Sequence, residues 1–173
     1  AHSVKYGGKG FSKMIQNVPI LKNQENAVLS SIPMQGTKYH YLNRGAKKMV
    51  IETTLSDHNL TLFVVHLSLT HGARKEQMSN LSDILKEKKK PYVVMGDFNS
   101  FRDDELHIFK EENGLEQAYE RAGLSLDNKT APSWNPRYAL DHVLVSDDID
   151  ISTYKVLDVH FSDHLPVMVD INM

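Results

Sequence analysis

The chain has 173 residues, 40% of them hydrophobic and 24% charged, a size and composition that fit one globular domain and exclude a disordered chain. Its 20 Lys and Arg residues against 22 Asp and Glu residues give a formal net charge of −2, which excludes a generally basic coat for nucleic acid, although not a local basic patch. The absence of Cys excludes disulfides, thiolate metal sites and Cys nucleophiles, and no apolar run approaches the ~18 residues of a membrane span. These features leave the compartment open, with the cytoplasm favoured.

The first half of the chain is predicted to be rich in strands. Residues 6–10 read as a loop, and residues 26–32 and 49–55 read as strands. Residues 60–67 are nearly all apolar, which predicts a strand that is buried on both faces. The turn-forming sequence SDHN at 56–59 separates the last two strands and predicts a β-hairpin.

Helical periodicity follows. Between residues 74 and 88 apolar residues recur at helical spacing among charged ones, which predicts an amphipathic helix that Pro91 ends. Residues 92–95 are the next buried strand, and residues 103–113 are a second helix that Gly114 stops. Three closing strands are predicted at 140–146, 151–159 and 165–171. This order of elements predicts an α/β fold, most simply two packed sheets flanked by helices.

Polar residues capable of catalysis stand at the ends of the apolar strands, where a rigid strand aims a side chain well. They are His66 in LFVVH, Asp97 and Asn99 in GDFN, Asp141 and His142 in DHVLVS, and Asp163 and His164 in FSDHLPV. Each has an ordinary structural interpretation, because a lone His at a strand end is usually just hydrogen-bonded and GDFN can form an Asp/Asn turn. The combination of three carboxylates, at least two His residues and an Asn, without an obvious Lys or Arg partner beside them in sequence, favours an active site.

This set of residues suits phosphoester chemistry. Hard oxygen ligands without Cys favour Mg²⁺ or Mn²⁺ over zinc, and one or two carboxylates together with a substrate phosphate usually hold such an ion. The ion would neutralise charge that develops on the phosphorus-bound oxygens. A further Asp can orient or deprotonate water, an Asn amide can hold that water, and an Asp-supported imidazole can shuttle protons.

The chain resembles the endonuclease/exonuclease/phosphatase (deoxyribonuclease I-like) superfamily, and within it the small metal-dependent hydrolase branch, in four segments that occur in this order: VVHLSLTHGARKEQMSNLSDIL, VVMGDFNS, PSWNPRYALDHVLVS and FSDHLPV. GDFN followed by SDH carries most of this signal. The resemblance extends from residue 26 to the C-terminus. It implies an α/β fold, a four-layer αββα sandwich that here lacks its first strands and helix, with the active site at one edge of the two sheets.

The resemblance also implies roles for the residues of the central motifs. Asp97 corresponds to the aspartate that orients or activates the attacking water, and it is a candidate metal ligand. Asn99 corresponds to the asparagine that contacts the phosphate or this water. His66 corresponds to the histidine that binds phosphate or acts as a general acid.

The C-terminal motifs imply four further assignments. Asp163 corresponds to the metal-associated aspartate of the SDH motif, and His164 to the catalytic histidine beside it. Asp141 corresponds to the aspartate that holds this histidine in position. His142 takes a place often filled by Tyr and is interpreted as a packing residue.

The resemblance breaks near the N-terminus. In the family the principal metal ligand is a Glu on an early strand, and this chain begins after that strand. Gln24 and Glu25 stand in the wrong strand to replace it, so Glu25 is interpreted as a solvated loop carboxylate. We therefore expect one N-terminally incomplete domain over 1–173: a fragment, a fold completed by a missing N-terminal segment or a second chain, or a protein that has lost part of its metal site.

The sequence favours a Mg²⁺-dependent phosphoester hydrolase, with a phosphodiester favoured as the substrate, and a non-catalytic or inactive module of the same fold is the alternative. DNA, RNA, a phospholipid head group and a small phosphorylated metabolite all stay open as substrates, although the near-neutral charge disfavours long duplex DNA. Trp134, in the loop before Asp141, could stack on a base or grip a head group, or simply anchor its loop. Arg74 could reach a phosphate but is expected to pair with an acid. A solvated helix end is expected for Lys86, Lys88, Lys89 and Lys90.

Overall fold

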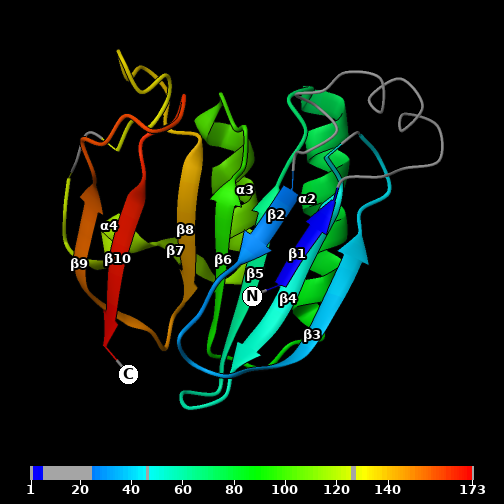
Figure 1. The fold of residues 1–173 in the computed structure, drawn as a ribbon. Helices are drawn as coiled ribbons and strands as arrows, with labels where there is room; N and C mark the ends of the chain where they lie inside the picture. Colours follow the sequence, from blue (N-terminus) through cyan, green and yellow to red (C-terminus); the bar gives the residue numbers. More distant parts are fainter. Residues whose placement is uncertain (1, 6–24, 46, 126–127, 173) are drawn as a thin grey trace.

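The fold is seen in a computed structural model, which describes residues 2–5, 25–45, 47–125 and 128–172. Figure 1 shows how the elements are arranged. In chain order the described elements are β1 (His2–Lys5), β2 (Glu25–Val28), β3 (Met34–Tyr41), β4 (Met49–Leu55), β5 (Leu60–His66), α2 (His71–Lys86), β6 (Tyr92–Asp97), α3 (Asp103–Asn113), β7 (Leu115–Gln117), α4 (Ala118–Arg121), β8 (Asp141–Ser146), β9 (Asp150–Val156) and β10 (Val167–Asn172).

Six strands form the central sheet in the order β3-β4-β5-β6-β8-β7. β5 and β6 run parallel, and the other neighbouring pairs in this sheet are antiparallel. A parallel pair needs a crossover connection, and α2 supplies it between β5 and β6. The predicted hairpin between β4 and β5 is confirmed, and Asn59 in its turn has φ 51°, a left-handed conformation that Asn tolerates.

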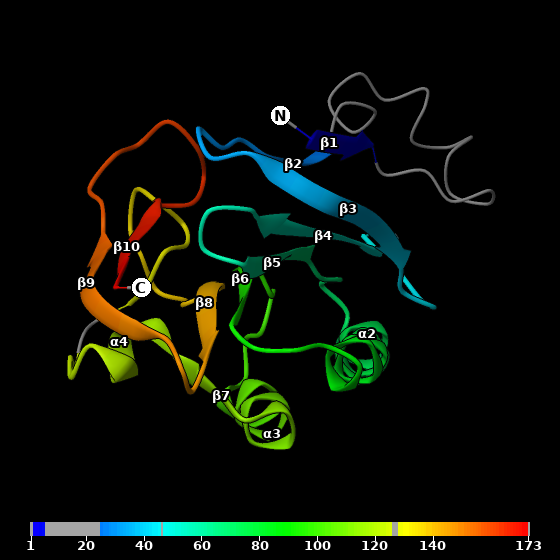
Figure 2. The ribbon, with the colours of Figure 1, turned by 90° about the horizontal axis from the view of Figure 1, so that it is seen from below.

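Helices α2 and α3 cover one face of the central sheet (Figure 2). The core between helices and sheet contains two aromatic pairs, Phe63 with Tyr92 and Phe98 with Phe109, whose ring centroids lie 6.0 Å and 6.2 Å apart. Leu81, at the centre of the amphipathic helix α2, is fully buried in the same core. Burying a side chain of this size contributes about 1.5–3 kcal/mol, so this layer holds the strands rigidly from one side.

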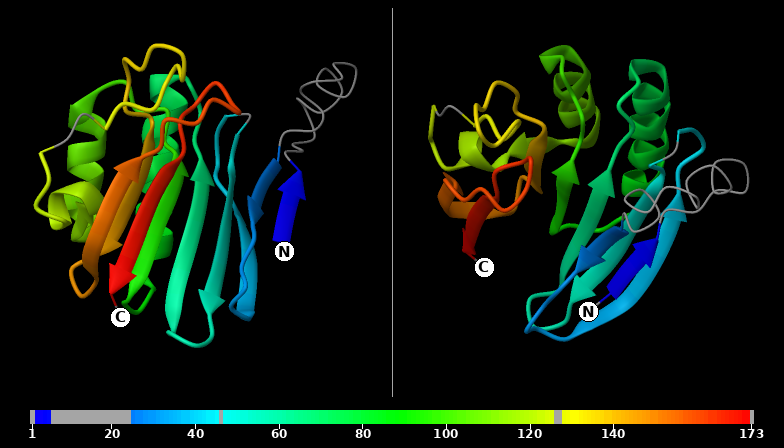
Figure 3. Two further views of the ribbon diagram at one scale, coloured as in Figure 1. Left: turned by 60° about the vertical axis from the view of Figure 1, so that its left-hand side comes forward. Right: turned by 45° about the horizontal axis from the view of Figure 1, so that its top comes forward.

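Two separate strand pairs lie over the other face of the sheet. The β1–β2 pair places β2 over β4 and β5, and the β9–β10 pair places β10 near β8 (Figures 2 and 3). The two pairs are not hydrogen-bonded to each other within the described residues. A groove of about 390 Å³ separates β2 from β10, and its floor includes Val64, Met95 and Val143 of the central sheet. The predicted α/β architecture is therefore confirmed, and its second strand layer is open.

Several strands differ from the sequence prediction, and β1 and β7 were not predicted. The strand expected at 26–32 ends at Val28, and it begins at Glu25, which therefore lies in a strand and not in a loop. β3 forms an edge of the central sheet that the sequence pattern did not predict. β5 is not buried on both faces, since Val64 and His66, which share one face of the strand, are only half-buried. That less covered face is where the groove and the polar strand ends lie.

The helices also differ at their ends. α2 begins at His71 and its C-cap is Glu87, so the helix ends before Pro91 is reached. Gly114 caps α3 as predicted, with φ 59° in the left-handed region that glycine adopts at no steric cost.

Residues 6–10, predicted to be a loop, lie outside the described residues. No helix in the described ranges is long and apolar enough to cross a membrane.

Candidate functional site

The site starts from a row of polar residues that crosses three neighbouring strands. His66 at the end of β5 is paired in register with Asp97 at the end of β6, and Asp97 is paired with Asp141 at the start of β8. Residues paired across strands point to the same face of a sheet, so these three side chains gather at one end of the central strands. This end of the sheet lies where the arrowheads of β5 and β6 end in Figure 1.

Asp97 is held tightly by its neighbours. Its Oδ1 accepts a hydrogen bond from the backbone N–H of Asn99 at 2.8 Å, and its Oδ2 accepts one from the Asn99 side-chain amide at 3.0 Å. The Nε2 atom of His66 lies 3.1 Å from the same Oδ2. Burial alone would raise the pKa of Asp97, but His66, the Asn99 N–H and the charge of His164 outweigh it, so the pKa lies below its ordinary value.

The local backbone structure explains two residues of GDFN, Gly96 and Asn99. Gly96 has φ 135°, and a Cβ there would lie 2.0 Å from the carbonyl oxygen of Val65 on β5, so only glycine lets β6 approach this closely. Asn99 has φ 50°, is buried, and donates its amide to the carbonyl of Leu67 at 2.9 Å. Asn99 therefore braces Asp97 against the segment that follows His66.

Asp141 and His164 form the second half of the site. The Nδ1–H of His164 donates to Asp141 Oδ2 at 2.7 Å, and the hydroxyl of the fully buried Thr130 donates to the same oxygen at 2.6 Å. The hydrogen bond to Asp141 is the main reason that the pKa of His164 lies above its ordinary value, against the opposing effect of burial. Thr130 was not singled out in the sequence, and no motif around it marks this contact.

The loop that carries the SDH motif is tied to the loop that carries Trp134. The N–H of Ser133 donates to the carbonyl of Asp163 at 2.7 Å, and the Ser133 hydroxyl donates to the carbonyl of Ser162 at 2.6 Å. The N–H of Leu165 donates to the carbonyl of Thr130 at 2.8 Å. These bonds bring His164 to Asp141, but they leave the Asp163 side chain exposed at the rim of the site.

Asp97, Asp141 and His164 are close enough to share a metal ion. Each offers one ligand atom, and these three atoms lie within 4.8 Å of one another. Asp163, the predicted metal-associated residue, is not a member of this group. Two half-buried carboxylates this close repel each other, and a divalent cation held by one or two carboxylates plus a substrate oxygen would relieve that repulsion. The two carboxylates therefore fit Mg²⁺ or Mn²⁺, whereas the Nδ1–H of His164 is committed to Asp141.

His142 behaves as the predicted packing residue. It is buried, its Nδ1 accepts a hydrogen bond from the Gln117 amide at 2.9 Å, and its ring meets Phe98 edge-on at 5.6 Å. Burial lowers the pKa of His142 to about 4, so it stays neutral at physiological pH. It follows Asp141 in β8, and consecutive strand residues point to opposite faces, which removes His142 from the site.

Trp134 does not anchor its loop through burial, because its side chain is 73% exposed. Phe161, which precedes the SDH motif, is 97% exposed. Phe101 and Tyr138 are partly exposed and form an edge-to-face contact at 5.3 Å. Aromatic side chains on the loops around the site are thus free to contact a bound group, as the stacking hypothesis for Trp134 requires.

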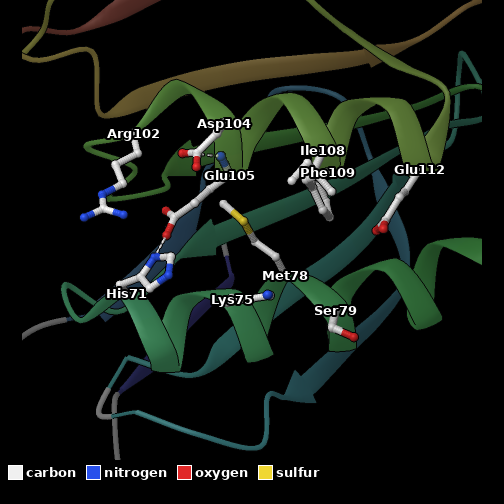
Figure 4. A pocket seen from close by; sticks show the side chains of 10 residues that line it. All are labelled: His71, Lys75, Met78, Ser79, Arg102, Asp104, Glu105, Ile108, Phe109 and Glu112. Carbon is white, nitrogen blue, oxygen red and sulfur yellow. Dashed lines mark hydrogen bonds and ion pairs between the residues drawn. The ribbon is translucent and has the colours of Figure 1, made fainter.

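Arg74 is not available to a phosphate. Its Nε donates to Glu105 Oε2 at 2.6 Å in the interface between α2 and α3, so the expected pairing with an acid is confirmed. Glu105 also meets His71 at one end of a cleft of about 340 Å³ between these helices, which is drawn in Figure 4. The predicted solvated lysine cluster is wrong for Lys88, which pairs with Glu52 at 2.7 Å.

Lys47 is the residue near the site that sequence reasoning missed. It lies two residues before β4, at the same end of the sheet, and its Nζ contacts Nε2 of His66. In sequence it is one of two adjacent lysines with no motif around them, so only the packing of β4 beside β5 reveals the contact.

Comparisons with known proteins found a matching family model and solved structures of similar fold. A family model described as "Endonuclease/Exonuclease/phosphatase family" matches residues 10–164. YbhP of Escherichia coli K12, described as an uncharacterized protein, is 29% identical over 167 residues, covering 86% of this chain and 62% of YbhP. A mannosyl-6-phosphatase of Bacteroides thetaiotaomicron is similar in structure with a TM-score of 0.65 and 19% identity, over 82% of this chain and 67% of that one. D. rerio TDP2, solved with a single-strand DNA product, gives a TM-score of 0.63 and 16% identity, over 81% and 68% of the two chains. This chain thus spans 62% of the length of its curated relative.

Proposed function

Because the chain belongs to the Endonuclease/Exonuclease/phosphatase family, we propose that it hydrolyses phosphoesters by attack of water on phosphorus. The proposed substrate is a phosphodiester, and the proposed cofactor is Mg²⁺ or Mn²⁺. The observation that carries the proposal is the convergence of Asp97, Asp141 and His164, whose ligand atoms lie within 4.8 Å of one another. Three different strand ends and loops supply these residues, an arrangement that a purely structural role does not require.

Asp97 is suited to act on the attacking water. Its low pKa keeps the carboxylate ionised near neutral pH, and Asn99 fixes its orientation through two hydrogen bonds. In the proposed step the water oxygen forms a bond to phosphorus, one proton of that water passes to Asp97, and the bond between phosphorus and the leaving oxygen breaks. The Asn99 amide steadies Asp97 while this proton moves.

The Asp141–His164 pair is suited to supply a proton to the leaving oxygen. Asp141 raises the pKa of His164, so the protonated ring persists closer to neutral pH. Because Nδ1–H is committed to Asp141, the other ring nitrogen is the one that can donate to the leaving group or to a phosphate oxygen. Mg²⁺ would be held by Asp97, with Asp163 nearby at the rim of the site. It would neutralise the negative charge that develops on the phosphate oxygens.

The side chains around the site and the net charge of the chain favour one class of substrate. The structural neighbours include a phosphatase of a sugar phosphate and a protein solved with single-strand DNA product, so the family likeness alone leaves the ester open. The exposed rings of Trp134 and Phe161 favour a substrate with an organic group on the leaving side of the phosphate. The formal charge of −2 disfavours long duplex DNA.

Hydrolysis of bis(p-nitrophenyl) phosphate tests the proposal. With Mg²⁺ present, we expect release of p-nitrophenolate that EDTA abolishes and that His164→Ala lowers by about 10²–10⁴-fold. His160→Ala is the matched control, because His160 is exposed in the same loop and pairs only with Asp158 at 2.7 Å among the contacts described. His160→Ala should retain the parent rate.

Two results would reject the proposed mechanism. Equal rates with Mg²⁺ and with EDTA would exclude the proposed cofactor, and equal rates for the parent and His164→Ala would exclude the proposed acid. No hydrolysis by the folded parent would instead favour the alternative, a non-catalytic or inactive module of this fold.

A further inference from the structure

Lys47 places a positive charge among the carboxylates of the site. Its Nζ contacts Nε2 of His66, which itself lies 3.1 Å from Asp97. The Lys47 side chain is half-buried, and burial lowers its pKa while the charges of Asp97 and Asp163 act in the opposite direction. The ammonium group is therefore directed toward the centre of the site.

The backbone of Lys47 is fixed from behind by a buried amide. Gln77 on α2 is fully buried, and its side-chain N–H₂ donates to the carbonyl of Lys47 at 2.6 Å and to that of Arg44 at 2.5 Å. Its Oε1 accepts from the N–H of Ser68, just beyond β5, at 2.8 Å. One amide thus ties the segment before β4 to the segment after β5, and this explains the Gln in the RKEQ stretch of α2.

Gly45 makes this tie possible. It has φ +93°, and a Cβ there would lie 2.0 Å from the hydroxyl oxygen of Ser68 and 2.9 Å from the amide nitrogen of Gln77. Any other residue would push the segment away from α2 and displace Lys47. The backbone of the Lys47 segment is therefore fixed by packing, and from this backbone the side chain reaches Nε2 of His66.

A phosphate that enters this site needs such a cation. Three carboxylates, Asp97, Asp141 and Asp163, stand around the place where the proposed reaction occurs, and they repel an anionic substrate. Arg74 is committed to Glu105, so it does not offset this repulsion. A half-buried ammonium is screened less by solvent than a surface lysine, which strengthens its attraction for a phosphate oxygen.

We propose that Lys47 binds a non-bridging oxygen of the substrate phosphate beside His66, and that Gln77 is the positioning residue that holds Lys47 there. This inference rests on the proposed function for the identity of the substrate, but the binding of phosphate can be measured without catalysis. The bound oxygen would lie beside His66 and accept a hydrogen bond from the Lys47 ammonium, while Nε2 of His66 stays 3.1 Å from Asp97 Oδ2.

Titration of the folded chain with inorganic phosphate, followed by calorimetry with Mg²⁺ present, tests the proposal. We expect Lys47→Gln to weaken the Kd for phosphate about tenfold. Lys47→Arg should restore most of the affinity, since the positive charge is kept. Lys48→Gln is the matched control, because it removes the adjacent lysine at the same net charge, and its Kd should equal that of the parent.

The outcomes separate this inference from the proposed function. If the parent does not bind phosphate, or if Lys47→Gln and Lys48→Gln have the same Kd, the role of Lys47 is wrong even where the parent hydrolyses its diester. If phosphate binding depends on Lys47 but no diester is hydrolysed, the inference stands and the proposed function falls. Where hydrolysis occurs, Lys47→Gln should raise KM for bis(p-nitrophenyl) phosphate more than it lowers kcat, and a structural defect would instead lower the Tm of the variant.

Discussion

Glu105→Gln should destabilise the fold by about 3 kcal/mol, because it leaves a buried guanidinium without its counter-charge. The Arg74 side chain is 3% exposed, and its Nε donates to Glu105 Oε2 at 2.6 Å. Its Nη1 donates to the carbonyls of Ser68 and Leu69 at 3.2 Å and 2.8 Å, which keeps the guanidinium in place after the change. Removal of one partner of a buried pair typically costs about 3–5 kcal/mol, and Gln retains one acceptor oxygen, so we expect the lower end of this range.

Urea unfolding at neutral pH, followed by circular dichroism, measures this loss as a change in the free energy of unfolding. Glu111→Gln is the matched control on the same helix, since Glu111 is exposed and pairs with His107 at 3.3 Å. The control should stay within about 0.5 kcal/mol of the parent. If Glu105→Gln changes the free energy of unfolding no more than Glu111→Gln does, the argument from burial is refuted.

The same pair predicts how the loss depends on pH. Burial alone would raise the pKa of Glu105, but Arg74 and His71 outweigh it, so the folded-state pKa lies below the ordinary 4.5. A carboxyl whose pKa is lowered on folding contributes stability above its unfolded-state pKa and loses it as the pH falls through the folded-state pKa. The difference between parent and Glu105→Gln should therefore be full at neutral pH and shrink in acid.

Three further predictions concern the site. Asp141→Asn should lower the pKa of His164 in an NMR titration, because it weakens the hydrogen bond that raises this pKa. The fall in kcat/KM toward alkaline pH should then begin at lower pH, and an unchanged His164 titration would contradict the pairing. Asn99→Ala removes the amide that braces Asp97, so hydrolysis of the diester should fall by about 10²–10³-fold, and a fall below threefold would exclude a role in orientation. Trp134→Ala should leave the free energy of unfolding within about 0.5 kcal/mol of the parent while KM rises, since the ring is 73% exposed; a larger loss of stability would mean that the ring anchors its loop.

The strand-end residues could be predicted from the sequence because each follows or opens a strongly apolar strand. His66, Asp97 and Asp141 were placed at strand ends by pattern alone, and the structure pairs them in one row. What the pattern could not give was the register between strands far apart in the chain. That register depends on the packing of the whole sheet.

Other features were missed because their signal is not local. β3 has the sequence MQGTKYHY, which mixes Gly, Lys and His with the apolar residues, since it is a largely exposed edge strand without a clear apolar face. Lys47 is one charged residue among many until β4 is placed beside β5. Thr130 supplies a single hydroxyl to Asp141, and a buried Thr has no sequence signature that separates it from any other.

The row of His66, Asp97 and Asp141 also makes activity a sensitive report on folding. A slip of one residue between β5 and β6 would set Gly96 or Phe98 beside His66 and turn Asp97 to the opposite face, in a chain that could still be compact and helical. Because β5 and β6 pair in parallel through the α2 crossover, their pairing must close a long loop, which makes it slow. A refolding chain should thus regain its helical circular dichroism signal before it regains activity. The delay between the two would measure how long the sheet takes to reach its correct register.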